Sequence, residues 1–413
     1  MKMASSVAFD IERVRRDFPI LSQQVYDKPL AYFDSAASAQ KPTAVIEAIK
    51  HTYETEYANV HRGVHYMSQK ATDAMEAARE TIRAFINAAS EREIIFVRGA
   101  TEGINLVADC WGHQNLKPGS EIILSQMEHH SNIVPWQLIA ERTGAIIKVV
   151  PVNDAGELEM DAYEDLLGDR TAMVSLTHVS NALGTITPMA EIVRLAHARG
   201  VPVLVDGCQA IPHLPVDVQA LDADFYVFSG HKLYGPSGIG VLYGKEALLD
   251  AMPPYQGGGE MIDLVTFEKT TYADLPFKFE AGTPHIAGVI ALGTAIDYIT
   301  GLGLEKIAAH EDDLLAYGTE QLGKINSLRF VGTAADKTAI LSFVLDDVHP
   351  HDIGTILDRE GVAVRTGHHC AQPIMERYDI AATVRASIGL YNTREEIDVL
   401  VTALGRVQEI FGS

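Results

Sequence analysis

Short apolar runs alternate with amphipathic segments from about residue 93 to residue 244, and this alternation constrains the fold more than any other feature. Seven runs carry the pattern: EIIFV (93–97), EIILSQ (121–126), IIKVVPV (146–152), AMVSLTHV (172–179), PVLVDG (202–207), DFYVFSG (224–230) and IGVLYG (239–244). Short, continuous apolar runs are typical of strands buried on both faces, and segments such as MAEIVRLAHARG between them have helical periodicity. We therefore expect an α/β architecture with a largely parallel sheet between helices.

The pattern changes after the motif EAGTPH (280–285). Helical periodicity continues to about residue 325, and the short strands RFVG, AILSFVL and VAVRTG precede a last helix. A chain of 413 residues exceeds one simple core, since domains usually hold about 100–200 residues. We expect an N-terminal segment (1–30) packed on the body of the protein, a large domain (31–290) and a smaller α+β domain (291–413).

Composition excludes several classes of protein. Hydrophobic residues make up 47% and charged residues 21%, as in an ordinary soluble globular protein. No apolar stretch reaches the ~18–20 residues of a membrane helix, and the N-terminus lacks a signal-peptide core, so we expect a cytoplasmic protein without membrane association. The net charge of −22 would repel nucleic acid. Three cysteines, Cys110, Cys208 and Cys370, argue against a disulfide framework.

Two strand ends present a lysine and a carboxylate. Lys232 follows the run DFYVFSG, and Asp206 ends the run PVLVD. Ligands of open α/β sheets bind at the carboxyl ends of the strands. A lysine for a Schiff base and an acid for a pyridinium nitrogen are the minimal equipment for pyridoxal phosphate. A single lysine is more often a solvated surface charge, so the prediction of a pyridoxal phosphate site depends on Lys232 and Asp206 occurring together.

The stretch RGATEGINLVADC supplies a candidate phosphate site. It places Ala100 and Thr101 at the start of an apolar-periodic helix, where free N–H groups and the helix dipole attract phosphate. Ser229 and His231, beside the lysine, offer further donors. Taken alone, such a turn is more often an ordinary helix cap.

A histidine pair follows another strand, in SQMEHHSNIVPWQ. His129 can lie flat on an aromatic cofactor; the alternatives are a capping histidine or half of a zinc site. Because the chain has no Cys-x-x-Cys and no H-E-x-x-H pattern, we expect no metal site. Cys370 follows the loop TGHH, where neighbouring imidazoles would favour a thiolate, whereas Cys110 is expected to be a small buried hydrophobe.

Taken together, these motifs resemble the SufS-type (group II) cysteine desulfurases, class V aminotransferase-like members of the fold-type I pyridoxal phosphate enzymes. The resemblance extends along nearly the whole chain and is carried by DSAASAQKP, YANVHRGVHYMS, VRGATEGINLV, MEHHSNIVPWQ, THVSNALGT, VDGCQA, DFYVFSGHKLYGP, FEAGTP, GVAVRTGHHCAQP and RASIGLYNT. Two positions depart from the family pattern. Cys208 stands where alanine or serine is expected, and we assign it to packing; Ala100 stands where threonine is common.

The resemblance implies a role for each site residue. Lys232 forms the Schiff base and acts as base for the substrate α-proton, Asp206 pairs with the pyridine nitrogen, and Gln209 contacts the ring hydroxyl. His129 stacks on the ring and exchanges protons beside it. The phosphate is bound by Ala100, Thr101, Ser229 and His231, and by Thr283 of a neighbouring subunit, which implies a homodimer.

The implied substrate is L-cysteine. Its carboxylate would be bound by Arg385, assisted by Asn181 and Arg365, since the planar guanidinium suits a carboxylate. The thiolate of Cys370 would attack the substrate sulfur, leaving alanine and a persulfide on Cys370.

A SufE-like or SufU-like acceptor would carry the sulfur to iron–sulfur cluster assembly. The stretch DVHPHD places His351 where it would borrow a zinc position from a SufU-like partner; the alternative is a histidine at the start of a helix. A selenocysteine lyase or cysteine sulfinate desulfinase would share every residue named. Two further alternatives are a cofactor-free hydrolase built on Cys370 and His369, and a non-catalytic scaffold.

Overall fold

A seven-stranded sheet forms the centre of the molecule, in the computed structural model, which describes residues 9–412. Its strand order is β4-β10-β9-β8-β7-β5-β6. Every predicted run forms one strand: β4 (Ile94–Val97), β5 (Glu121–Ser125), β6 (Ile146–Val150), β7 (Thr171–Thr177), β8 (Val203–Asp206), β9 (Phe225–Ser229) and β10 (Gly240–Gly244). Neighbours from β6 to β9 are parallel, whereas β10 runs antiparallel to both β9 and β4. The predicted α/β fold with a mostly parallel sheet is confirmed.

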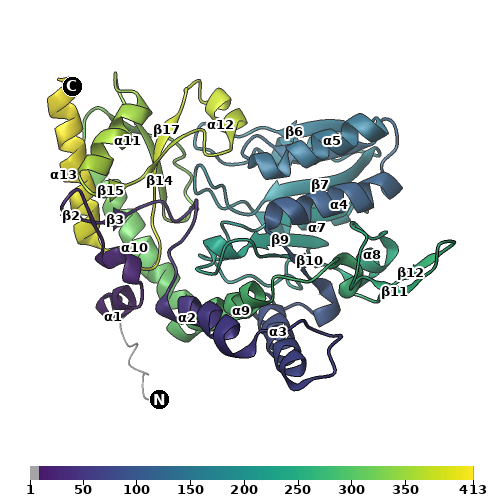
Figure 1. Cartoon of the computed structure of the whole chain (residues 1–413). Coiled ribbons are helices and arrows are strands. Elements are labelled where there is room, and N and C mark those ends of the chain that lie inside the picture. Colours follow the sequence, from purple (N-terminus) through teal and green to yellow (C-terminus); the bar gives the residue numbers. More distant parts are fainter. Residues whose placement is uncertain (1–8, 413) are drawn as a thin grey trace, which may run out of the picture.

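Both faces of this sheet are buried except at the edge strand β6, and this burial explains why the other strands read as continuous apolar runs. Successive residues of a strand point to opposite faces. Ile95 packs in a core cluster with Trp136 and residues of α4, while its neighbour Phe96 belongs to a second cluster with Met75 and Leu292. The covering helices include α4 (Ala100–Asn115), α5 (Val134–Thr143), α6 (Met160–Leu166), α7 (Met189–His197) and α8 (Glu246–Ala251) (Figure 1).

Long helices connect the large sheet to the C-terminal part of the chain. Their bounds are α2 (Thr43–His51), α3 (Tyr66–Phe85), α9 (Ile286–Leu302) and α10 (Leu304–Leu322). The apolar helix α9 packs against α2 and α3 and is buried along most of its length. Among residues 9–412, no single helix is long and apolar enough to cross a membrane; α9 and α10 meet that criterion only together, across a 75° bend.

A second, four-stranded sheet with order β13-β14-β17-β16 lies in the C-terminal part. Its strands and helices are β13 (Leu328–Phe330), β14 (Ile340–Leu345), β16 (Arg365–Gly367), β17 (Thr383–Ser387), α11 (Pro350–Arg359), α12 (Gln372–Arg377) and α13 (Arg394–Phe411). The sequence reading missed β17, which is the strand that carries Arg385.

The N-terminal elements pack on this C-terminal part (Figure 1). They are α1 (Ile11–Arg16), β1 (Gln24–Val25), β2 (Lys28–Pro29) and β3 (Ala31–Tyr32), the last of which pairs with β15 (Val362–Ala363). Arg15 forms a 2.9 Å ion pair with Glu396 of α13. The exact division into three segments stays a prediction.

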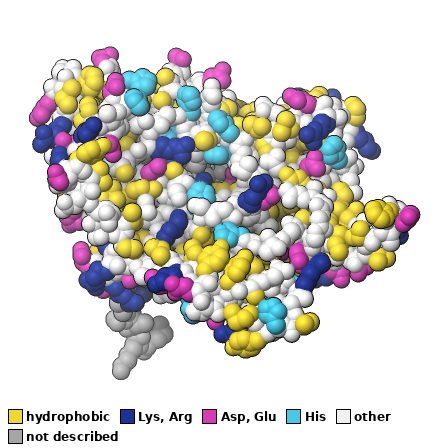
Figure 2. All heavy atoms as spheres, viewed as in Figure 1, with side chains coloured by type: hydrophobic (Ala, Val, Ile, Leu, Met, Phe, Trp, Pro, Cys, Tyr) yellow, Lys and Arg dark blue, Asp and Glu magenta, His cyan; other side chains and the backbone are white. Residues whose placement is uncertain are grey.

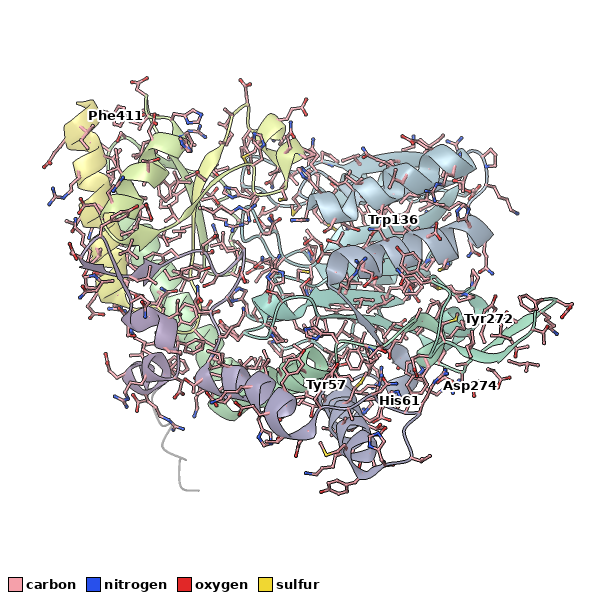
Figure 3. The ribbon with its side chains drawn as sticks, in the orientation of Figure 1. Tyr57, His61, Trp136, Tyr272, Asp274 and Phe411 are labelled. Atoms are coloured by element: carbon pink, nitrogen blue, oxygen red, sulfur yellow. The ribbon has the colours of Figure 1, made fainter. Side chains whose placement is uncertain are left out.

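The remaining elements are short. They are η1 (Pro19–Ser22), η2 (Thr52–Glu56), η3 (Glu91–Glu93), η4 (His130–Asn132), η5 (Gly230–Lys232), η6 (Phe277–Phe279) and the hairpin β11 (Ile262–Val265) with β12 (Thr270–Tyr272). The hairpin projects from the body of the chain, and Tyr272 lies on it (Figure 3).

Candidate active site

A cavity of about 140 Å³ lies at the carboxyl ends of the parallel strands, beside the first turn of α4. Most of the predicted site residues line it: Ala100, Thr101, His129, Asn181, Asp206, Gln209, Ser229, His231, Lys232 and Arg365. On the face shown in Figure 2, histidine, lysine and arginine side chains gather along the middle of the molecule.

The ends of β8 and β9 position the acid and the lysine. Asp206 is the last residue of β8 and pairs in register with Val227 of β9. It is buried, and its Oδ1 accepts a 3.0 Å hydrogen bond from the N–H of Cys208. The chain leaves β9 at Ser229 and makes the single turn η5, which ends at Lys232. Adjacent strand ends therefore bring the two groups into one cavity.

The first turn of α4 lies where the sequence predicts the phosphate cradle. N–H groups of a first helical turn have no acceptor within the helix. The N–H of Ala100 donates a 2.9 Å bond to Ser229 Oγ, which ties the cradle to β9, and Thr101 lies next in the turn. Gly240 permits the close approach of β10, since a Cβ there would lie 2.6 Å from the Cα of Gly99.

His129 is held as a neutral imidazole. Burial, and then the charge of Lys232, lower the pKa of His129 to about 4. Its Nδ1 accepts hydrogen bonds from the N–H of Ser131 at 3.1 Å and from the hydroxyl of Ser131 at 2.8 Å. The single ring proton must then be on Nε2, which gives this imidazole one defined donor.

Gln209 presents an acceptor that the chain itself leaves unused. Its Nε2 donates a 2.6 Å bond to the carbonyl of Ala36, while its buried Oε1 has no partner among the described residues. A hydroxyl on a bound ring would satisfy that oxygen. With an acid, an imidazole, a lysine and a helix N-terminus in the same cavity, the residues fit pyridoxal phosphate.

The cysteine loop lies between β16 and α12. Cys370 is half-buried with a φ of 55°, and Arg365 Nη2 lies 3.5 Å from its Sγ. The carbonyl of Cys370 accepts a 2.7 Å bond from the N–H of His130, so the loop is fixed to the histidine segment.

Positive charge beside Cys370 has a different source from the one the sequence suggested. Burial, and then Arg385 and Arg365, lower the pKa of His369 to about 2, so this imidazole is neutral. Its Nε2 is 2.7 Å from Thr383 Oγ1. The expectation that neighbouring imidazoles favour the thiolate is wrong for His369, and the guanidinium of Arg365 is the cation in contact with the sulfur.

Arg385 is fully buried on β17, behind the cavity lining. Its Nη2 donates to Asp34 Oδ1 and its Nη1 to the carbonyl of Asn181, both at 2.9 Å, while its Nε has no partner in the described part of the chain. Asn181 in turn donates from Nδ2 to the carbonyl of His369 at 2.6 Å. Asn181 and Arg365 line the cavity directly.

Thr283 lies away from this cavity. It lines a separate cavity of about 360 Å³ together with Arg98, Glu102 and His285. Within one chain, Thr283 is therefore not brought to the other predicted phosphate residues.

Glu128, which directly precedes His129 and His130, was not predicted from the sequence as a site residue. Its carboxyl is fully buried and accepts hydrogen bonds from Ser125 Oγ at 2.5 Å, Asn132 Nδ2 at 2.7 Å and the N–H of Thr177 at 3.1 Å. Burial raises the pKa of Glu128 to about 8. The available signal was a glutamate directly before two histidines at a strand end.

The other two cysteines are buried, as predicted. Burial raises the pKa of both Cys110 and Cys208 to about 12. No group of three or more His, Cys, Asp or Glu side chains within residues 9–412 is arranged to hold a metal ion.

Comparison with known proteins places the chain in a family. Residues 31–400 match the aminotransferase class-V family. A cysteine desulfurase of Synechococcus elongatus is 56% identical over 98% of this chain, which spans 65% of that protein's length. A cysteine desulfurase of Escherichia coli is 52% identical over 98% of this chain and 100% of its own. The chain belongs to the aminotransferase class-V family and, within it, to the cysteine desulfurases, which are pyridoxal phosphate enzymes.

Solved structures agree with this assignment. The cysteine desulfurase CsdA of Escherichia coli, solved with an S-sulfonic acid, has a TM-score of 0.91 at 40% identity and covers 98% of this chain and 99% of its own. A mutant C-DES protein with glycine covalently linked to its PLP cofactor has a TM-score of 0.80 at 25% identity, covering 94% and 98%.

Proposed function

We propose that this protein converts L-cysteine to L-alanine and holds the released sulfur as a persulfide on Cys370. The observation that carries the proposal is the meeting of Lys232, Asp206 and His129 in one cavity, with Arg365 of the same cavity in contact with the Cys370 sulfur. Membership of the cysteine desulfurases supports it.

Each part of the cavity suits one part of the cofactor. When bound, pyridoxal phosphate supplies an electron sink for the bonds broken at the substrate. Lys232 would hold it covalently, Asp206 would pair with its ring nitrogen, and Oε1 of Gln209, which has no partner among the described residues, would accept from its ring hydroxyl. The first turn of α4 and the side chains of Thr101, Ser229 and His231 would bind its phosphate.

Substrate orientation depends on positive charge around the cysteine loop. Nε of Arg385 is the guanidinium donor left free by Asp34 and Asn181, and we assign it to the substrate carboxylate. Because Arg385 lies behind the cavity lining, this contact requires the lining side chains to move when the substrate binds. Arg365 lines the cavity and contacts the Cys370 sulfur, so its guanidinium would attract the substrate carboxylate and places positive charge beside the sulfur.

Proton and sulfur transfers follow from these positions. The Lys232 amine takes the α-proton of the substrate, and the neutral His129 offers its Nε2–H as a donor beside the reacting carbons. Sγ of Cys370 then bonds to the substrate sulfur as that sulfur's bond to Cβ breaks. The electron pair stays with Cβ, which gains a proton, and Lys232 returns a proton to Cα, so the products are alanine and a persulfide on Cys370.

A partner must remove the sulfur, and we infer that it is a SufE-like or SufU-like acceptor feeding iron–sulfur cluster assembly. His351 lies exposed in the first turn of α11, which leaves it accessible to a zinc-containing partner. Stimulation of turnover by a SufU-like protein and its loss in His351→Ala would support that choice. Stimulation by a SufE-like protein alone would refute the choice of a SufU-like acceptor.

We further propose a homodimer in which Thr283 serves the partner's phosphate site. Large apolar side chains that a partner would cover are exposed at Val64 and Tyr66 and on the projecting hairpin at Leu264 and Phe267. Light scattering after size-exclusion chromatography tests the oligomeric state. A monomer that retains full activity would refute the shared site.

Activity is tested by alanine release from L-cysteine, L-selenocysteine and cysteine sulfinate, each with a thiol reductant present. The proposal predicts the highest kcat/KM for L-cysteine, with alanine and sulfide released in equal amounts. Higher kcat/KM for either other substrate would reassign the enzyme within the family. The hydrolase alternative does not hold, since His369 contacts Thr383 and the chain belongs to a pyridoxal phosphate family.

A further inference from the structure

A second polar cavity lies apart from the active site. It has a volume of about 420 Å³ and is enclosed by α10, the loop between β13 and β14 and the turn that follows β8. Its charged and titratable lining residues are His213, Glu311, Asp312, Asp336 and Lys337. No residue lines both this cavity and the active-site cavity.

One carboxylate oxygen in this cavity has no partner. Glu311 is 3% exposed, and its Oε2 accepts a 2.6 Å hydrogen bond from His213 Nδ1. Its Oε1 is buried and accepts no hydrogen bond from the described residues. Buried polar atoms are nearly always hydrogen-bonded, so an unpartnered oxygen on a residue that lines a cavity indicates a missing N–H donor.

Lys337, which lines the same cavity, has no counter-charge among the described residues. Lys337 is half-buried, and its Nζ donates a 2.9 Å bond to the carbonyl of Gly332. An ammonium has three donors, and Lys337 forms no ion pair within residues 9–412. Burial lowers the pKa of Lys337 to about 8, so the side chain remains mostly charged at neutral pH.

We propose that this cavity binds a small α-amino acid as its zwitterion. The ammonium of the ligand donates to Glu311 Oε1, and its carboxylate accepts from Lys337 Nζ. Glu311 and Lys337 form no ion pair with each other, so a ligand that carries both charges is needed to satisfy both groups.

The other charges favour a zwitterion over simpler ligands. Asp312 and Asp336 are exposed side chains of the same cavity and would repel phosphate or a dicarboxylate. A simple amine would leave Lys337 without a counter-charge, and a simple carboxylate would leave Glu311 Oε1 without a donor. This site is independent of the proposed reaction, because none of its residues belongs to the active site.

Sarcosine is a suitable probe for isothermal titration calorimetry on the holoenzyme. It keeps an N–H₂⁺ group and a carboxylate, and as a secondary amine it cannot form a neutral imine with an active-site aldehyde. We expect one saturable site per chain, at least tenfold weaker binding in Glu311→Gln and in Lys337→Met, and unchanged binding in Lys324→Met. Lys324 is an exposed lysine just after α10 and serves as the matched control.

Acetate and dimethylamine, which each carry one of the two charges, should bind at least tenfold more weakly than sarcosine. Ala308→Phe, on the cavity wall, fills the site without changing a charge and should also abolish binding. It keeps the test decisive if either charge variant fails to fold. Absence of saturable binding to the wild type would overturn the proposal. So would sarcosine binding that persists in the folded variants, because the ligand would then occupy the active site.

Discussion

The ion pair between Arg385 and Asp34 should be one of the most consequential polar contacts in the chain. Its Nη2–Oδ1 distance is 2.9 Å, and the side chains of Arg385 and Asp34 are 0% and 25% exposed. It joins the start of the chain to β17, because Asp34 follows β3 and bridges in parallel to Ser387. Asp34→Ala would leave a fully buried guanidinium without its counter-charge.

The expected loss of stability follows from this burial. Removing one partner of a buried ion pair costs roughly 3–5 kcal/mol, because the remaining charge is left uncompensated. Asp34 is partly hydrated and Arg385 keeps its bond to the Asn181 carbonyl, so we expect the lower end, about 3 kcal/mol. Asp34→Asn retains an acceptor oxygen and should cost less than Asp34→Ala.

The chain provides a matched control in the exposed pair between Arg394 and Asp313, whose side chains are 53% and 50% exposed. Exposed ion pairs contribute about 0–1 kcal/mol, so Asp313→Ala should be nearly neutral. Urea unfolding of all three variants and the wild type, followed by circular dichroism, measures the difference. If Asp34→Ala shifted the free energy of unfolding no more than Asp313→Ala, the inference that burial makes this pair important would be refuted.

Three further outcomes are expected. Burial raises the pKa of Glu128 from the ordinary 4.5 to about 8. Between these two pH values the folded chain keeps a proton that the unfolded chain releases. The free energy of unfolding should therefore fall by roughly 1.4 kcal/mol for each unit of rising pH in this range. Glu128→Gln should flatten that slope in urea titrations, and an unchanged slope would contradict the assignment. Iodoacetamide at pH 8 should label Cys370 but not Cys110 or Cys208, whose thiols have pKa values near 12, as peptide mass spectrometry can show. Lys232→Ala should lose cofactor absorbance after dialysis and all alanine formation, and turnover by this variant would exclude Lys232 as the base.

Much of the large sheet could be predicted because its strands are buried on both faces. Each run of five to eight mostly apolar residues can be recognised from its own sequence, and every predicted run corresponds to one strand. The antiparallel direction of β10 and the strand order were not accessible, since both depend on contacts between distant segments. β17 has the sequence TVRAS, in which polar and apolar residues alternate around a buried arginine, so it lacks the continuous apolar run that marked the other strands. It lies between β14 and β16.

Residues at strand ends were predictable for a similar reason. Asp206, Lys232 and Thr101 each follow or precede a recognisable element, so their convergence could be inferred. The contact of Arg365 with Cys370 depends on a tight loop with positive φ, and the partner of Arg385 lies at the opposite end of the sequence. These two contacts could not be predicted from the sequence, because they depend on the three-dimensional structure.

The most direct test of the proposed reaction is the location of the sulfur. Purified protein would be mixed with L-cysteine without reductant, digested and analysed by mass spectrometry for one added sulfur atom. We expect the added sulfur atom on the Cys370 peptide, both in the wild type and in Cys110→Ala. Cys370→Ala should keep the cofactor absorbance but form neither persulfide nor alanine at an appreciable rate. Full alanine production by Cys370→Ala, or a persulfide on another cysteine, would contradict the proposed reaction.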